Sequence, residues 1–270
     1  MVVQHNLTAM NSNRMLGLTT SSLAKSTEKL SSGYKVNRAA DDAAGLAISE
    51  KMRRQVRGLT QASANAQDGI SCVQTAEGAL NEVHDMLQRM NELAVKAAND
   101  TNTTEDQRYI NQEVQALISE VDRVASTTTF NNQNLLDGTF IGKGLQVGAE
   151  ANQTITLSIS SMKASGLGIS GLSVSGTGDA QTAITTIKSA ISLLNEQRSA
   201  LGAVQNRLEH TIKNLDNIAE NTSAAESAIR DTDMATEMVR FSNQNILAQA
   251  GQSMLAQANQ SNQGVMSLLG

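Results

Sequence analysis

The chain has 270 residues, a net charge of −5, 40% hydrophobic residues, only 2% aromatic residues and no proline. Nucleic-acid binding requires clustered Lys and Arg, so a mildly acidic chain of this kind indicates no nucleic-acid partner. Because proline interrupts a helix interior, its absence favours long helices, and the scarcity of aromatic rings favours helices packed closely along their length.

The N-terminal segment has an apolar residue at every seventh position. Its first thirteen residues contain no Asp, Glu, Lys or Arg. A seven-residue spacing is typical of a coiled-coil seam, so we expect a helix that packs against another helix. The residues of this line are Val2, Ala9, Leu16, Leu23 and Leu30.

A long helix is predicted from residue 43 to about residue 99. Its heptad line consists of Met52, Leu59, Ala66, Val73, Leu80, Leu87 and Ala94. The preceding Asp41 and Asp42 have the form of a catalytic carboxylate pair, but at the head of a helix they are better interpreted as caps that suit its dipole. After a break at 98–103, Thr104 and Gln107 fit a capping box that opens a second helix over 105–126. We expect this helix to fold back antiparallel.

Glycine and turn residues are concentrated between residues 130 and 178. Within that region residues 154–159 alternate polar and apolar, which predicts a small β-hairpin. Helical spacing returns from Asp179, a plausible N-cap, in a segment about as long as the first long helix. Its heptad line contains Ile187, Leu194, Leu201, Leu208, Leu215 and Ile229.

The C-terminal segment, residues 241–270, contains no charged side chain. A helix lying on a membrane would show Lys or Arg on its polar face, whereas this one shows only amides, so we expect a helix-to-helix seam and no membrane insertion. The predicted stripe consists of Val239, Ile246, Ala250, Met254, Ala258, Val265 and Leu269. The two ends are therefore expected to pair.

These elements predict a mainly α fold. It comprises an elongated helical bundle, or coiled coil, of long heptad helices with a small β-hairpin region, plus a terminal two-helix coil. Cys72 is interpreted as a small packed residue. His5, His84 and His210 are isolated from one another in the sequence. No metal site, cofactor or enzymatic activity is therefore predicted.

Several ordered motifs resemble the two halves of bacterial flagellin. The N-terminal motifs are residues 30–33, 37–48, 59–63, 68–71, 75–82 and 92–95, and the C-terminal motifs are residues 201–208 and 249–260. The resemblance implies a short flagellin with D0 and D1 domains only. Residues 1–40 and 236–270 would form the terminal coil of D0, and residues 41–235 would form D1, with the hairpin region at 130–178.

The resemblance implies a secreted subunit that self-assembles into the extracellular filament of the bacterial flagellum for swimming. It further implies export by the flagellar type III apparatus and contacts with an export chaperone, the filament cap and hook-filament junction proteins. We expect self-assembly to use Leu16, Leu23, Leu30, Ile246, Leu247, Met254, Leu255, Val265 and Leu268. Two alternatives are a hook-filament junction protein and, from a different class, an intracellular coiled-coil scaffold, which would have charged ends.

The resemblance also implies that the monomer is bound by Toll-like receptor 5 through Arg89, Leu93 and Glu113. Arg89 and Leu93 are four residues apart and so share a helix face. Leu93 and Glu113 lie about equally far on either side of the turn near Thr103, so an antiparallel return would place them opposite each other. The alternative is that Leu93 belongs to the bundle core and Arg89 is a solvated charge.

Overall fold

The computed structural model describes residues 6–269, with side chains described as far as Ser261. Contacts divide the chain into two compact units. The first, here called the terminal unit, combines Met1–Arg54 with Asn221–Gly270. The second, here called the central unit, is Gln55–Glu220. Helices dominate both units, as predicted.

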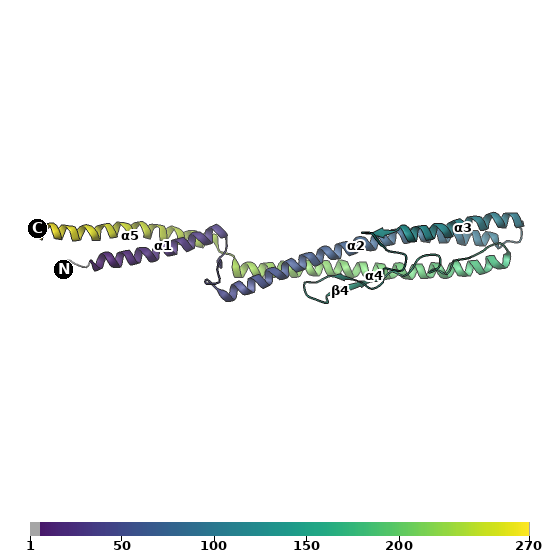
Figure 1. Cartoon of the computed structure of the whole chain (residues 1–270), viewed down its shortest axis with the longest axis horizontal. Coiled ribbons are helices and arrows are strands. Elements are labelled where there is room, and N and C mark those ends of the chain that lie inside the picture. The colour runs from purple at the N-terminus through teal and green to yellow at the C-terminus, as the bar shows by residue number, and fades with distance from the viewer. Residues whose placement is uncertain (1–5, 270) are drawn as a thin grey trace. The chain divides into compact units, whose positions relative to one another are not determined.

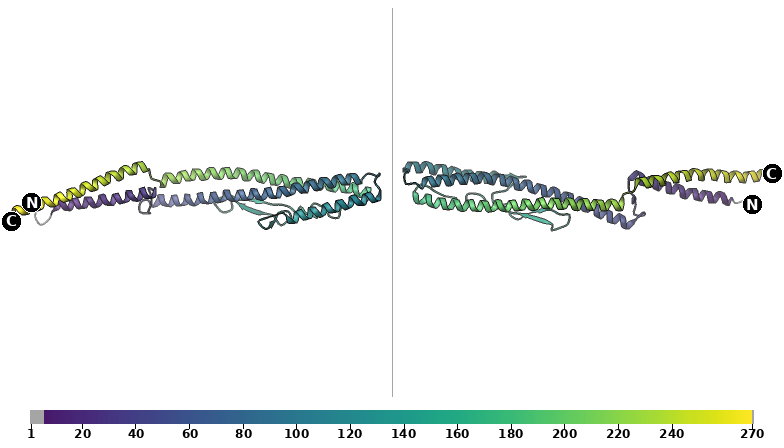
Figure 2. Two further views of the ribbon diagram at one scale, coloured as in Figure 1. Left: turned by 90° about the horizontal axis from the view of Figure 1, so that it is seen from above. Right: turned by 180° about the vertical axis from the view of Figure 1, so that it is seen from behind.

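Five helices are described in residues 6–269, and two of them are long. Their bounds are α1 Leu7–Ser32, α2 Ala43–Ala97, α3 Thr104–Thr127, α4 Thr177–Arg230 and α5 Met234–Leu269. With 55 residues in α2 and 54 in α4, the prediction of two long helices of similar length is confirmed. Within the central unit, α2, α3 and α4 run side by side, with α3 folded back along α2 (Figures 1 and 2).

The core of the central unit follows the two predicted heptad lines. In α2, Leu80 and Leu87 are fully buried, and in α4 so are Ile187, Leu194 and Leu208. Facing helices bury these residues because seven-residue spacing keeps one side of each helix toward its neighbour. Alanines between them, such as Ala190, let the helix backbones approach closely.

Side-chain caps set the starts of α2 and α3. The Gly45 amide donates to Asp42 Oδ1 at 2.9 Å, which confirms a capping role for Asp42. The capping box of α3 lies one residue earlier than predicted, at Thr103 with Asp106. Thr103 and Thr104 carry the same hydroxyl group, so the sequence pattern does not decide which of them is the cap. In the structure the Asp106 carboxylate accepts a hydrogen bond from the Thr103 amide at 3.0 Å.

The N-cap predicted at Asp179 is wrong. Helix α4 begins at Thr177, because the amide of Ala180 already donates to the carbonyl of Gly176 at 2.8 Å. Asp179 instead lies in the first turn. A carboxylate there still suits the positive end of the helix dipole.

Two small antiparallel hairpins lie between α3 and α4. Strands β1 (Thr129–Phe130) and β2 (Gln133–Asn134) pair around Asn131 and Asn132, which both have positive φ. Strand β3 (Lys143–Gln146) pairs with β4 (Thr154–Leu157). The alternation predicted for β4 is confirmed, since Ile155 and Leu157 are buried and their neighbours are exposed. Ile155 belongs to a cluster with residues of α2 and α4, and Figure 1 shows β4 beside α4.

Candidate functional surfaces

Helices α1 and α5 pack side by side in the terminal unit, as predicted (Figure 1). On α1, Leu16, Leu23 and Leu30 are half-buried, in agreement with the heptad line. A Cβ atom added at Gly251 of α5 would lie 3.3 Å from Leu16 Cδ1, so the absence of a side chain lets the helices approach closely. In this coil, leucines of α1 therefore pack against a surface of α5 that contains small residues.

The face of α5 that packs on α1 differs from the predicted stripe. The less exposed positions are Glu237, Phe241, Gln244, Ala248, Gly251, Leu255 and Ala258, at steps of three and four. In contrast, Val239, Ile246 and Met254 of the predicted stripe are each more than 60% exposed. The prediction counted apolar side chains only, whereas Gln244 joins the seam by accepting a hydrogen bond from the Ser26 hydroxyl at 3.1 Å.

The coil therefore presents unpartnered apolar side chains to solvent. Those more than half exposed are Leu7, Met10, Met15 and Leu18 of α1 and Met238, Val239, Ile246, Leu247 and Met254 of α5. Nine such side chains on two paired helices indicate that another molecule covers some of them. Of the expected self-assembly residues, Ile246, Leu247 and Met254 lie on this surface. The side chains of Val265 and Leu268 lie outside the described residues.

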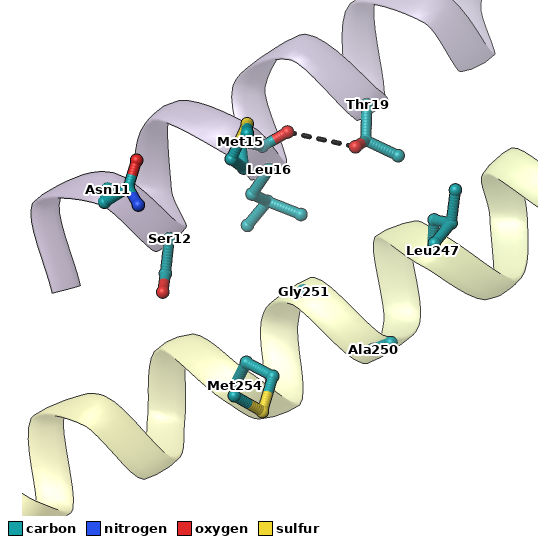
Figure 3. Close-up of a pocket in the computed structure, with 9 residues that line it drawn as sticks. All are labelled: Asn11, Ser12, Met15, Leu16, Thr19, Leu247, Ala250, Gly251 and Met254. Carbon is teal, nitrogen blue, oxygen red and sulfur yellow. Dashed lines mark hydrogen bonds between the residues drawn. The ribbon is translucent and has the colours of Figure 1, made fainter. Parts of the chain in front are cut away.

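A groove runs between the two helices within this apolar surface (Figure 3). Its volume is about 320 Å³. Met15 and Leu16 line it from α1, and Leu247 and Met254 line it from α5, with Ala250 and Gly251 between them. Because the α5 wall is small at these two positions, the groove has room for an apolar side chain from another molecule.

A second groove, of about 430 Å³, lies between α2 and α3 in the central unit. The Arg89 guanidinium contacts Glu113 across the two helices, with Nη2 and Oε1 2.9 Å apart, and also donates to Glu92 Oε2 at 3.1 Å. The hydrogen bond to Glu113 is the main reason that the pKa of Arg89 is raised. This contact shows that α3 returns antiparallel to α2, as predicted, and that Arg89 and Glu113 lie opposite each other on the two helices.

Leu93 lines the same groove but is only 3% exposed. It therefore belongs to the core, which was the alternative interpretation from sequence. Arg89 agrees with the solvated charge of that alternative, because its side chain remains 52% exposed, and it is in addition ion-paired with Glu113.

The sequence did not predict the other five residues that line this groove, which include Lys96 and Tyr109. Tyr109 is 56% exposed, and the Arg108 guanidinium lies 5.0 Å from its ring centroid. Lys96 is seven residues from Arg89, and Tyr109 is four residues from Glu113. Their helical spacing could have placed them on the same faces.

None of the helices described in residues 6–269 has the length and hydropathy that a membrane span requires. The described residues also contain no group of three or more His, Cys, Asp or Glu side chains that could hold a metal ion. Cys72 is buried, and burial raises the pKa of its thiol, which agrees with its interpretation as a packed residue.

The heptad-packed helices of both units define a coiled-coil protein. A family model described as the bacterial flagellin N-terminal helical region matches residues 3–141, and one described as the bacterial flagellin C-terminal helical region matches residues 184–269. The chain belongs to the bacterial flagellin family, as the resemblance indicated. It is accordingly a structural protein of the flagellar filament and not an enzyme.

Similar proteins include two flagellins that match over full length. A flagellin of Halalkalibacterium halodurans is 55% identical over 271 residues, covering 100% of both chains. A flagellin of Bacillus subtilis is 48% identical over 306 residues, again covering 100% of both. The crystal structure of Bacillus cereus flagellin shares 31% identity at a TM-score of 0.50, covering 60% of this chain and 94% of that one.

Proposed function

We propose that copies of this chain polymerise into the extracellular filament through the exposed apolar surface of α1 and α5. The observation that carries the proposal is the set of nine large apolar side chains left uncovered on the paired terminal helices. Burying one such side chain fully contributes about 1.5–3 kcal/mol, so contacts with neighbouring copies have a substantial driving force. The filament would then serve swimming.

The domain assignment is part of this proposal. Residues 1–40 and 236–270 would form the terminal coil, and residues 41–235 the rod that carries the hairpins. The lack of charge in residues 241–270 supports burial of the coil in the filament, because burying an unpaired charge there would be costly. An intracellular coiled-coil scaffold would not need uncharged ends, so this feature favours the filament.

The proposal is tested with charge substitutions on the exposed face. Leu247→Asp and Met254→Asp alter side chains that are 59% and 62% exposed, so we expect the single chain to keep its helicity. Seeded polymerisation, followed by sedimentation and electron microscopy, should show a critical concentration more than about tenfold higher, because each carboxylate would be buried unpaired. The matched control is Met254→Leu, which keeps an apolar side chain and should polymerise normally.

Normal polymerisation of both aspartate variants would show that this face is not the assembly surface. If the wild-type chain itself formed only short assemblies, this would instead favour the hook-filament junction alternative, whose members form a short ring. The two results are distinguished by filament length in the micrographs.

We also propose that the free monomer is bound by Toll-like receptor 5 at the groove of Arg89, Leu93 and Glu113. The ion pair and the half-exposed Arg89 support a polar contact, and the nearly buried Leu93 would supply only part of the groove wall. The other proposed partners are the flagellar export apparatus, an export chaperone, the filament cap and the hook-filament junction proteins. A chaperone fits an exported chain whose α5 would otherwise expose apolar residues.

A further inference from the structure

Two connectors of the terminal unit pair with each other. One, residues 33–42, joins α1 to α2, and the other, residues 231–233, joins α4 to α5. The Lys35 amide donates to the Arg230 carbonyl at 2.7 Å, and the Thr232 amide donates to the Gly33 carbonyl at 2.9 Å. Between these bonds, Tyr34 and Asp231 form an antiparallel bridge. The segments thus behave locally like a minimal two-stranded ladder.

The side chain of Arg230 reinforces this pairing from the end of α4. Its guanidinium carbon lies 4.5 Å from the centroid of the Tyr34 ring, within the range of a cation–π contact. Its Nη1 donates to Glu50 Oε1 of α2 at 2.7 Å. Arg230 therefore contacts the first connector with both its carbonyl and its side chain, and it also contacts the helix that follows that connector.

The Arg230 side chain is only 12% exposed, whereas that of Glu50 is 52% exposed, so the ion pair is shielded from water on the arginine side only. Arg53 Nη1 also donates to Glu50 at 3.3 Å, and Arg53 Nη2 lies 3.5 Å from Glu226 Oε1, which extends the contact into a chain of alternating charges. Removing the Arg230 side chain would remove both the contact with the Tyr34 ring and the hydrogen bond to Glu50. The pairing should therefore depend strongly on Arg230.

The first connector has further internal order. Val36 is 4% exposed, and the Asp41 carboxylate accepts from the amides of Asn37 and Arg38 at 3.3 and 3.0 Å. These bonds fix the turn but do not attach it to α4. The attachment comes from the Arg230 contacts and the bonds of Lys35 and Thr232, together with a bond from Lys35 Nζ to the Ala228 carbonyl at 3.1 Å.

We propose that Arg230 is a latch that holds the connector of residues 33–42 folded against the end of α4 and the start of α2 in the single, unassembled chain. A connector ordered in advance loses less conformational entropy when the terminal helices become fixed by other contacts. The latch is a property of the single chain and does not depend on the proposed filament interface.

Amide hydrogen exchange of the full-length monomer, measured by NMR, tests the latch. In Arg230→Ala the carbonyl at position 230 remains, so only the side-chain contacts are lost. We expect the amides of Lys35 and Thr232 to exchange about tenfold faster or more, while amides of α3 keep their protection. Glu50→Gln, a milder change that leaves the Tyr34 contact in place, should accelerate the same two amides to a smaller extent.

The matched control is Arg38→Ala. Arg38 belongs to the same connector and also forms an ion pair, with Glu28 at 2.8 Å, but its side chain is 72% exposed. We expect this variant to leave the Lys35 and Thr232 amides protected. Unchanged exchange at these amides in Arg230→Ala or in Glu50→Gln would overturn the proposal. So would an equal loss of protection along α1 and α5, because Arg230 would then be a general packing residue.

Discussion

Leu93 combines a core position with a place in the wall of the α2–α3 groove. Replacing it by Ala should lower the free energy of unfolding of the monomer by about 2–5 kcal/mol, as for other buried leucines. Val95, two residues away and 55% exposed, is the control, and Val95→Ala should leave thermal unfolding nearly unchanged. Equal stability of Leu93→Ala and wild type would contradict the packing described for Leu93. A loss of receptor binding in Leu93→Ala must be corrected for this destabilisation.

Arg89 and Glu113 allow a cleaner test of receptor binding. Both side chains are about half exposed, so removing either should change monomer stability little. If they are central contacts, Arg89→Ala should weaken binding to the Toll-like receptor 5 ectodomain about tenfold or more in surface plasmon resonance. The charge-swapped double variant Arg89→Glu with Glu113→Arg keeps an ion pair but reverses its polarity, so it should remain weak. Wild-type affinity in both variants would refute the site.

The pairing of α1 with α5 depends on the small residues of α5. Gly251→Leu would place a large side chain where even a Cβ atom lies 3.3 Å from Leu16 Cδ1, so we expect Leu16 to be displaced and the packing of the two helices to loosen there. We expect faster amide exchange in α1 near Leu16. Gly202→Leu in α4 is the control, because a Cβ there meets no atom within 4 Å and leucine favours a helix more than glycine does. Unchanged protection of α1 in Gly251→Leu would mean that the helices do not rely on close approach.

The helices were predictable from sequence because their signals repeat over many turns. The heptad lines through Leu80 and Leu194 correctly identified the core of α2 and α4, and the alternation around Ile155 identified β4. Single-residue features were less predictable. Thr103 and Thr104 are equally good caps in isolation, and only the three-dimensional contacts of Asp106 decide between them.

The packed face of α5 could not be derived from apolar spacing alone. Apolar residues occur on both sides of this helix, and the side that meets α1 contains Gly251 and the hydrogen-bonded Gln244. Likewise, sequence reasoning placed Arg89, Leu93 and Glu113 together but could not show that Leu93 is nearly buried. Tyr109 and Lys96 were missed because the motif itself does not include them.

For the whole molecule, assembly and folding should be separable. A chain that ends at Arg240 lacks residues 241–270 and hence most of α5, with the exposed side chains of Ile246, Leu247 and Met254. The core of the central unit involves none of these residues. We expect this truncated chain to remain helical, to keep the thermal transition of the central unit, and to stay monomeric in analytical ultracentrifugation. Long filaments formed by it would show that α5 is dispensable for assembly.

The apolar side chains of the terminal helices should be exposed in the monomer and covered in the filament. Methionine oxidation measures this directly, because Met10, Met15, Met238 and Met254 are each more than half exposed, whereas Met90 is fully buried. Peptide mass spectrometry after brief peroxide treatment should show rapid oxidation of the four exposed methionines in the monomer, much slower oxidation in the filament, and slow oxidation of Met90 in both. Equally rapid oxidation of the four methionines in monomer and filament would contradict the account.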